Sequence, residues 1–190
     1  MDFEKVIAGC KSYQCNEEEL KEITEFVTKV REERKPRDKR NVDEGPHRFI
    51  REKVGKIGEV SAAKFYGGNV NFQIFPNNTY GHDIDLENTQ TTYQDYVKTC
   101  SEDEAKKHGF SWIFAKGDPL YHSPTPNQRI ILMCANAEGK AWVLGHVLAP
   151  NLTGRFGPCR ALKHKVAIWL KTTMTYEGPK EGIENILVKD

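Results

Sequence analysis

The chain has 190 residues, of which 38% are hydrophobic and 29% charged, and its formal net charge is +1. This length suits one domain with a buried core, and the composition excludes a disordered chain. No apolar run approaches the roughly 20 residues that a membrane-spanning helix needs, so no such helix is expected. The first residues also lack the basic and then apolar pattern of a secretory signal. We therefore expect an intracellular, cytoplasmic protein.

The five cysteines show no sign of a disulfide framework or of a zinc site. Their number is odd, and their spacings match no pair of zinc ligands. Free thiols in a reducing compartment are the expectation for such a set. The cysteines are Cys10, Cys15, Cys100, Cys134 and Cys159.

The first third of the chain has the pattern of helices. Residues 2–12 are a candidate short helix. Asn16 is a candidate N-cap, with Glu19 as its partner in a capping box, and apolar residues then recur at helical spacing. This second helix should end before Pro36, because the residue before a proline disfavours the helical conformation.

Residues 31–40 form a basic stretch with six basic and three acidic residues. The stretch is a candidate arm for contacts with DNA phosphates, although a solvated helix end and loop would have the same charge pattern. The net charge of the chain is low for a nucleic-acid coat, but a local basic groove is enough to offset phosphate charge at one site. The candidate DNA-binding residues are Arg31, Arg34, Lys35, Arg37, Lys39 and Arg40.

Beyond residue 69 the pattern changes from helical to extended. Helices first and strands later predict an α/β fold, with N-terminal helices packed on a central mixed β-sheet. Within one globular domain we distinguish a helical segment with the basic arm at 1–45 and an α/β core at 46–190. The expected strands are residues 70–75, 83–86, 93–99, 110–115, 129–135, 141–148 and 164–173.

A third helix should begin at Pro46 and run to Tyr66, before Gly67-Gly68. Apolar residues lie all round its second half, which indicates a helix buried on more than one side. Glu59 falls among them, and a buried carboxylate is rare unless it is paired or binds a metal. A salt bridge to Lys56, one turn away, is the alternative to a functional role.

Two aspartates stand in the short strand candidate at residues 83–86. Side chains alternate along a strand, so Asp83 and Asp85 should point to the same face. A divalent cation would remove their mutual repulsion, and magnesium requires oxygen ligands. An acidic, solvent-exposed strand edge explains the pair equally well.

Lys98 stands in the next strand candidate, where lysine is unusual among apolar residues. Beside a metal carboxylate site, a lysine can orient a water molecule or stabilise the charge of a transition state. A lysine on an edge strand, with no role in chemistry, is the alternative.

The order of these features is that of a known family: a glutamate on a buried helix, a strand with aspartates, and a strand ending in Val-Lys-Thr. The chain resembles the PD-(D/E)XK, or restriction-endonuclease-like, superfamily of nucleases over about residues 47–148. The resemblance implies a restriction-endonuclease-like core. It also implies catalytic roles for Glu59, Asp85 and Lys98. The metal ligands that it implies are Glu59 and Asp85, with Asp83 as a third.

The sequence departs from the family motif two positions before the lysine, where the family has an acid and this chain has Tyr96. Tyrosine does not replace a carboxylate as a magnesium ligand at neutral pH. Gln94 is on the correct face and has a carbonyl oxygen, whereas Asp95 would need a bulge to turn it to that face. The ligand set therefore stays open.

The function that the resemblance implies is hydrolysis of phosphodiester bonds in DNA by an endonuclease that uses Mg²⁺, with Mn²⁺ as a substitute. A phage, restriction or DNA-degradation context fits, in the host cytoplasm if the chain is phage-encoded. The alternative is a catalytically inactive module of the same fold that binds DNA or a protein partner. No membrane partner is expected, and a homodimer stays open.

Overall fold

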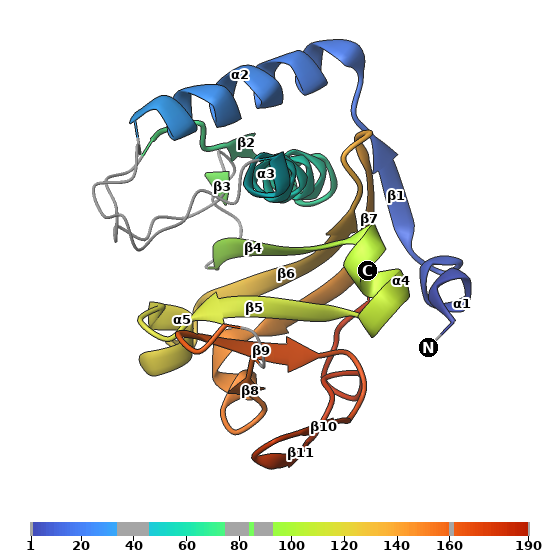
Figure 1. The fold of residues 1–190 in the computed structure, drawn as a ribbon, viewed down its shortest axis with the longest axis vertical. Coiled ribbons are helices and arrows are strands. Elements are labelled where there is room, and N and C mark those ends of the chain that lie inside the picture. Colours follow the sequence, from blue (N-terminus) through green and yellow to red (C-terminus); the bar gives the residue numbers. More distant parts are fainter. Residues whose placement is uncertain (1, 34–45, 75–83, 86–92, 160–161, 190) are drawn as a thin grey trace.

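The central layer of the molecule is a four-stranded sheet (Figure 1). The structure is a computed structural model that describes residues 2–33, 46–74, 84–85, 93–159 and 162–189. In spatial order the strands are β1 (Lys11–Gln14), β7 (Lys140–Leu148), β6 (Gln128–Ala135) and β4 (Gln94–Ser101). Because β4 is parallel to β6 while β7 is antiparallel to both β6 and β1, the sheet is mixed. The predicted α/β class with a mixed sheet is confirmed.

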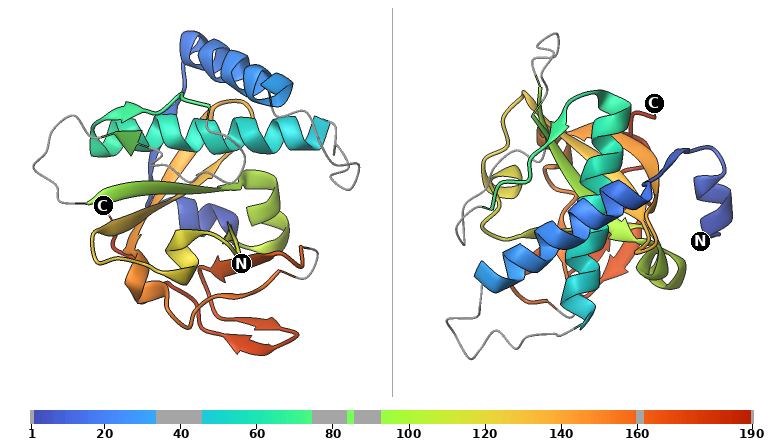
Figure 2. Two further views of the ribbon diagram at one scale, coloured as in Figure 1. Left: turned by 90° about the vertical axis from the view of Figure 1, so that its left-hand side faces the viewer. Right: turned by 90° about the horizontal axis from the view of Figure 1, so that it is seen from above.

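Two long helices lie on one side of this sheet. Figure 2 shows α3 (Pro46–Tyr66) along the sheet and α2 (Glu17–Glu33) packed across α3. The predicted capping box begins α2: the Glu19 N–H donates to Asn16 Oδ1, and the Asn16 N–H donates to Glu19 Oε2, both at 2.9 Å. The bounds of α3 are those predicted. No helix in the described part of the chain is long and apolar enough to cross a membrane.

A second sheet covers the opposite face of the central sheet. It consists of β5 (Ser111–Ala115), β9 (Lys165–Trp169) and β8 (Gly157–Pro158), all antiparallel. The strand β6 is buried along its whole length, because its residues pack alternately against the helices and against the second sheet. Burial on both faces explains why residues 129–135 are almost continuously apolar.

The remaining elements are short and lie around these layers. The β2–β3 pair follows α3, and the β10–β11 pair extends beyond the second sheet (Figure 1). The remaining short elements are α1 (Phe3–Ile7), β2 (Asn69–Val70), β3 (Ile84–Asp85), α4 (Glu102–His108), α5 (Pro119–His122), the 3₁₀ helix η1 (Ala149–Leu152), β10 (Thr173–Thr175) and β11 (Gly178–Lys180).

The N-terminal segment differs from the sequence prediction. Residues 2–12 do not form one helix, since α1 ends at Ile7 and β1 begins at Lys11. The strand β1 pairs with β7, so the segment 1–45 adds a strand to the central sheet and is not purely helical. The physical reason is tertiary: β1 satisfies the open hydrogen-bonding edge of β7, which local periodicity does not reveal. All five cysteines are free, as predicted.

Candidate functional site

Glu59 lies on α3 and forms an ion pair with Lys56 of the same helix. The Lys56 Nζ donates hydrogen bonds to Glu59 Oε2 and, at 2.9 Å, to the backbone oxygen of Asn71. The ammonium also lies 4.4 Å from the ring centroid of Phe26 and 5.2 Å from that of Phe72. Only 8% of the Lys56 side chain and 18% of the Glu59 side chain are exposed. The salt bridge considered as the alternative for Glu59 is therefore present.

Asp85 lies on β3, beside the strand that follows α3. The register of the β2–β3 pair sets Asp85 opposite Asn69 and Ile84 opposite Val70. The pair thus runs next to the C-terminal end of α3, which contacts β2. The side chain of Asp85 and the whole of Asp83 lie outside the described residues, so their shared face stays a prediction.

The direction of each side chain on β4 follows from its ladder with β6. This parallel ladder is uninterrupted from Gln94 to Ser101, so no bulge alters the alternation. Val97 packs in the core beneath the helices, whereas Cys100 packs in the core beside β5. The backbone of α3 approaches β4 so closely that a Cβ on Gly58 would lie 2.0 Å from Thr99 Oγ1.

Lys98 points toward β5. Its Nζ donates to Asp118 Oδ2 at 3.2 Å and lies 5.1 Å from the ring centroid of Phe114. A quarter of its side chain is exposed, at 25%. The structure therefore does not bring Lys98 and Glu59 together: the helix that carries Glu59 covers the other face of β4. The expectation of one centre containing both side chains is corrected, and the reason is the regular alternation of β4.

Asp95 lies on the helix-covered face, and its side chain is fully buried. Both of its oxygens accept hydrogen bonds from Arg129, at 2.6 and 2.7 Å. The Arg129 guanidinium lies 4.9 Å from the ring centroid of Tyr66 and 5.2 Å from that of Tyr93. Asp95 is thus a partner of arginine, and no bulge turns it toward Lys98 as a metal ligand would require.

The other two residues near the motif are Tyr96 and Gln94. Both lie on the same strand face as Lys98, as predicted. The Tyr96 hydroxyl accepts a long hydrogen bond, 3.5 Å, from Gln128 Nε2, while Gln94 is exposed at the start of the strand. Gln94 could therefore bind a metal only on the β5 face of β4, whereas Glu59 lies over the opposite face.

The predicted basic arm falls almost entirely on residues 34–45, which lie outside the described residues. Arg31 is described near the end of α2, and its guanidinium lies 5.9 Å from the ring centroid of Phe49. The structure leaves untested the DNA contacts expected for Arg34, Lys35, Arg37, Lys39 and Arg40.

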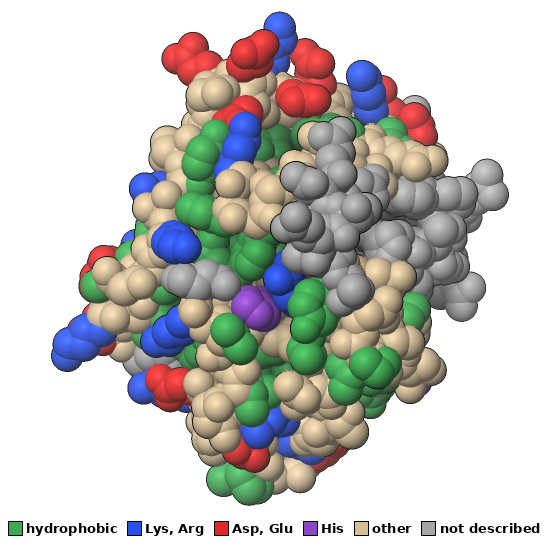
Figure 3. Space-filling model, turned by 180° about the vertical axis from the view of Figure 1, so that it is seen from behind, with side chains coloured by type: hydrophobic (Ala, Val, Ile, Leu, Met, Phe, Trp, Pro, Cys, Tyr) green, Lys and Arg blue, Asp and Glu red, His purple; other side chains and the backbone are tan. Residues whose placement is uncertain are grey.

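The surface seen from behind is uneven in charge. Acidic side chains gather at the top of Figure 3, where α2 lies, and basic and hydrophobic side chains occupy the middle, beside the atoms that are not described.

Within the described residues, no three His, Cys, Asp or Glu side chains come together as a group that could hold a metal ion.

Sequence reasoning missed Asp118 and Arg129, although both left a signal. Asp118-Pro119 has the form of an N-cap followed by proline at the first helical position, and the Leu120 N–H donates to Asp118 Oδ1 at 3.1 Å. Arg129 begins an otherwise apolar run, where an arginine needs a buried partner.

Comparison with protein-family models, with curated proteins and with solved structures gives no match to this chain.

Proposed function

We propose that this chain is a metal-dependent nuclease that hydrolyses phosphodiester bonds in DNA and has a restriction-endonuclease-like core. One observation carries the proposal: α3 contacts β2 and β4, and β3 contacts the same two strands. The segments around Glu59, Asp85 and Lys98, which suggest the family, therefore belong to one contiguous unit although they are distant in sequence.

The proposed metal ligands are Glu59 and Asp85, with Asp83 as a third. Glu59 fits such a role because it is a half-buried carboxylate, and magnesium prefers oxygen ligands. Lys56 already balances one negative charge there, so a divalent ion would need the second carboxylate that Asp85 supplies. A bound Mg²⁺ or Mn²⁺ would polarise the scissile phosphate and lower the pKa of a bound water.

Two lysines are candidates for a cationic role in the reaction. Lys56 contacts Glu59 directly, whereas Lys98 lies on the other face of β4 with Asp118. A lysine that acts in the transition state affects turnover more than DNA affinity. Changed to Met, the acting lysine should lose about 10²-fold in cleavage rate, and the other should not. Melting temperatures must accompany these rates, because Lys56 is buried.

The test of the proposal is cleavage of end-labelled single- and double-stranded DNA with Mg²⁺, with Mn²⁺ and with chelator. Asp85→Ala and Glu59→Gln should each abolish metal-dependent cleavage while the fold persists. The matched control is Glu25→Gln, which removes the same charge from an exposed position on α2 and should cleave normally. Full activity of Asp85→Ala would end the metal assignment.

The proposed DNA contact includes the basic arm. Neutralising Arg37, Lys39 and Arg40 together should weaken DNA binding and flatten the slope of log affinity against log salt. An unchanged slope and affinity would leave the arm as a solvated loop. Homodimerisation stays a prediction, and light scattering of the purified chain tests it.

The second candidate is a catalytically inactive module that binds DNA or a protein partner. It is favoured by β4, where Tyr96 replaces the family acid, Asp95 is held by Arg129 and Lys98 is held by Asp118. Absence of cleavage with every metal, together with DNA binding that persists in chelator, would favour this candidate over the nuclease.

A further inference from the structure

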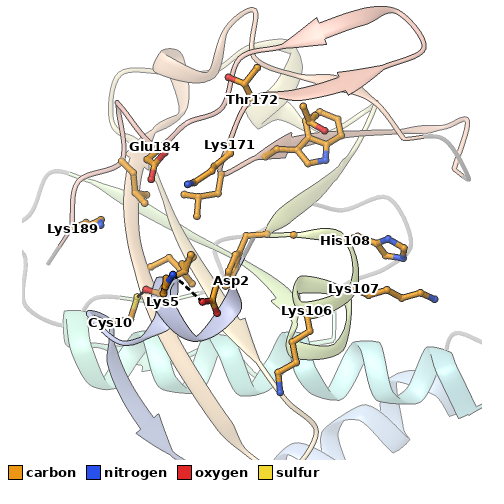
Figure 4. Close-up of a pocket in the computed structure, with 18 residues that line it drawn as sticks. Asp2, Lys5, Cys10, Lys106, Lys107, His108, Lys171, Thr172, Glu184 and Lys189 are labelled. Carbon is orange, nitrogen blue, oxygen red and sulfur yellow. Dashed lines mark hydrogen bonds and ion pairs between the residues drawn. The ribbon is translucent and has the colours of Figure 1, made fainter.

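A cavity of about 820 Å³ lies at the end of the molecule where the two termini of the described chain meet α4 and β9 (Figure 4). Its walls come from α1, from the C-terminal end of α4, from the segment between β9 and β10, and from the last residues of the described chain. No residue that we assign to the proposed nuclease site lines it. Its volume is in the range of ligand sites, about 300–1,000 Å³.

Basic side chains dominate the polar lining. Five lysines line the cavity against two acidic residues, Asp2 and Glu184. In Figure 4, Lys5, Lys171 and Lys189 lie on the same side as Glu184, whereas Lys107 and His108 extend away from them on the other side. The fifth lysine is Lys106. The cavity therefore favours an anion.

Several of these lysines have no strong internal partner. In the part of the chain that the structure describes, no acidic side chain forms an ion pair with Lys107, Lys171 or Lys189. The Lys5 Nζ lies 3.5 Å from Asp2 Oδ2, but 84% of the lysine side chain is exposed, so this surface pair exchanges easily for a ligand.

The α4 lysines have a structural explanation that the others lack. Lys106 and Lys107 lie in the last turn of α4, where positive charge complements the helix dipole, and Lys106 is paired with Glu102 at 2.5 Å. Lys171 and Lys189 lie outside helices, so no helix end explains them. These two lysines are the direct candidates for contact with an anion.

The floor of the cavity is apolar. Phe110, Leu144 and Leu170 are buried there, and the Trp169 side chain is half-buried in the wall. An aromatic wall beside lysines suits a ligand that joins a flat ring to a phosphate, because bases stack on indole rings and lysine binds phosphate as a point charge.

We propose that this cavity binds a nucleoside phosphate, with the phosphate at Lys171 and Lys189 and the base on the apolar wall. The nucleotide can be free or part of a strand, since the recognised chemistry is the same. The proposal does not depend on nuclease activity, because binding is measured in chelator, where metal-dependent cleavage does not occur.

The test is binding of adenosine 5′-monophosphate, by calorimetry, and of a short fluorescein-labelled oligothymidylate, by anisotropy, to the full chain at low salt in chelator. The Lys171→Gln/Lys189→Gln variant should bind about tenfold more weakly or worse, because hydrogen bonds to a charged group are the stronger class. Glu184→Gln removes an acid from the cavity lining and should tighten binding. All three positions are exposed, so the fold should persist, which circular dichroism checks.

The matched control is Lys21→Gln/Lys29→Gln, which removes the same charge from exposed positions on α2. Loss of monophosphate binding in the cavity variant alone supports a free nucleotide as the ligand. Loss of oligothymidylate binding in that variant alone supports a strand. Equal loss in the control variant, or no binding of either probe to the wild-type chain, overturns the proposal.

Discussion

The two faces of β4 hold their charged residues in different ways. On the helix-covered face, Asp95 is fully buried and both of its oxygens accept from Arg129. On the β5 face, Lys98 is a quarter exposed and donates to Asp118 at 3.2 Å. Loss of Arg129 leaves the fully buried Asp95 carboxylate uncompensated, whereas the Lys98 ammonium can be hydrated without its partner. The first pair is therefore the more costly to break. In the second pair only Lys98 is open to solvent, because 5% of the Asp118 side chain is exposed.

The largest effect should come from breaking the buried pair. Arg129→Met leaves the Asp95 carboxylate buried without its bidentate partner and should lower the free energy of unfolding by about 3–5 kcal/mol. Urea denaturation measures the change. The double variant Asp95→Leu/Arg129→Met removes both charges and should recover much of that loss. A single variant as stable as wild type would show that the pair is not important for the fold.

The next largest loss of stability is expected where α3 closely approaches β4, and a second glycine of α3 provides the control. Gly58→Ala places a Cβ 2.0 Å from Thr99 Oγ1, so neighbours must shift, at a cost of about 1–3 kcal/mol. Gly55→Ala meets nothing within 4 Å and should stabilise the helix by roughly 0.5–1 kcal/mol. Thermal melting compares the two. Equal stability of these variants would contradict the tight contact between α3 and β4.

On the β5 face of β4, removing the basic partner of an ion pair should lower stability less than Arg129→Met does on the helix-covered face. Lys98→Met removes one hydrogen bond from Asp118, which still accepts from the Leu120 N–H at the start of α5. The expected loss of stability is about 1.5 kcal/mol, the lower end of the range for hydrogen bonds to charged groups, because Asp118 keeps its other hydrogen bond. Urea denaturation measures it. A loss as large as that of Arg129→Met would make the two faces equivalent and remove the contrast.

The smallest effect concerns Glu19, which links α2 to α3 on the helix-covered side. Burial raises the pKa of Glu19, but hydrogen bonds with Lys64, the Asn16 N–H and the Tyr13 hydroxyl outweigh it, so the pKa is lowered from 4.5. Because the pKa is lower in the folded state, the charged carboxylate stabilises the fold at any pH above its pKa in the unfolded chain. That stability is lost as the pH falls through the pKa of the folded state.

Glu19→Gln keeps the size of the side chain and loses its charge. It should therefore cost about 0.5–1 kcal/mol at neutral pH, and the difference from wild type should shrink at acidic pH below 4.5. Urea denaturation at several pH values measures this. Glu22→Gln, on an exposed position of α2, is the control. A difference that stays constant with pH would exclude a charge effect at Glu19.

The sequence predicted those parts of the fold that depend on neighbours along the chain. The capping box at Asn16 and Glu19, the bounds of α3 and the position of β6 all follow local patterns that the structure confirms. It did not predict β1, which depends on an open edge of β7 that is distant in sequence.

For the candidate site, the sequence identified residue types and their order. For Glu59 it offered two interpretations, a functional role and a salt bridge to Lys56. The alternation of β4 was also predictable, including Lys98 on the face of Tyr96 and Asp95 on the other. Only the tertiary structure decided which layer each face meets, because helix and sheet packing is set by contacts between distant segments. That packing pairs Lys98 with Asp118 and Asp95 with Arg129, and it keeps Lys98 apart from Glu59.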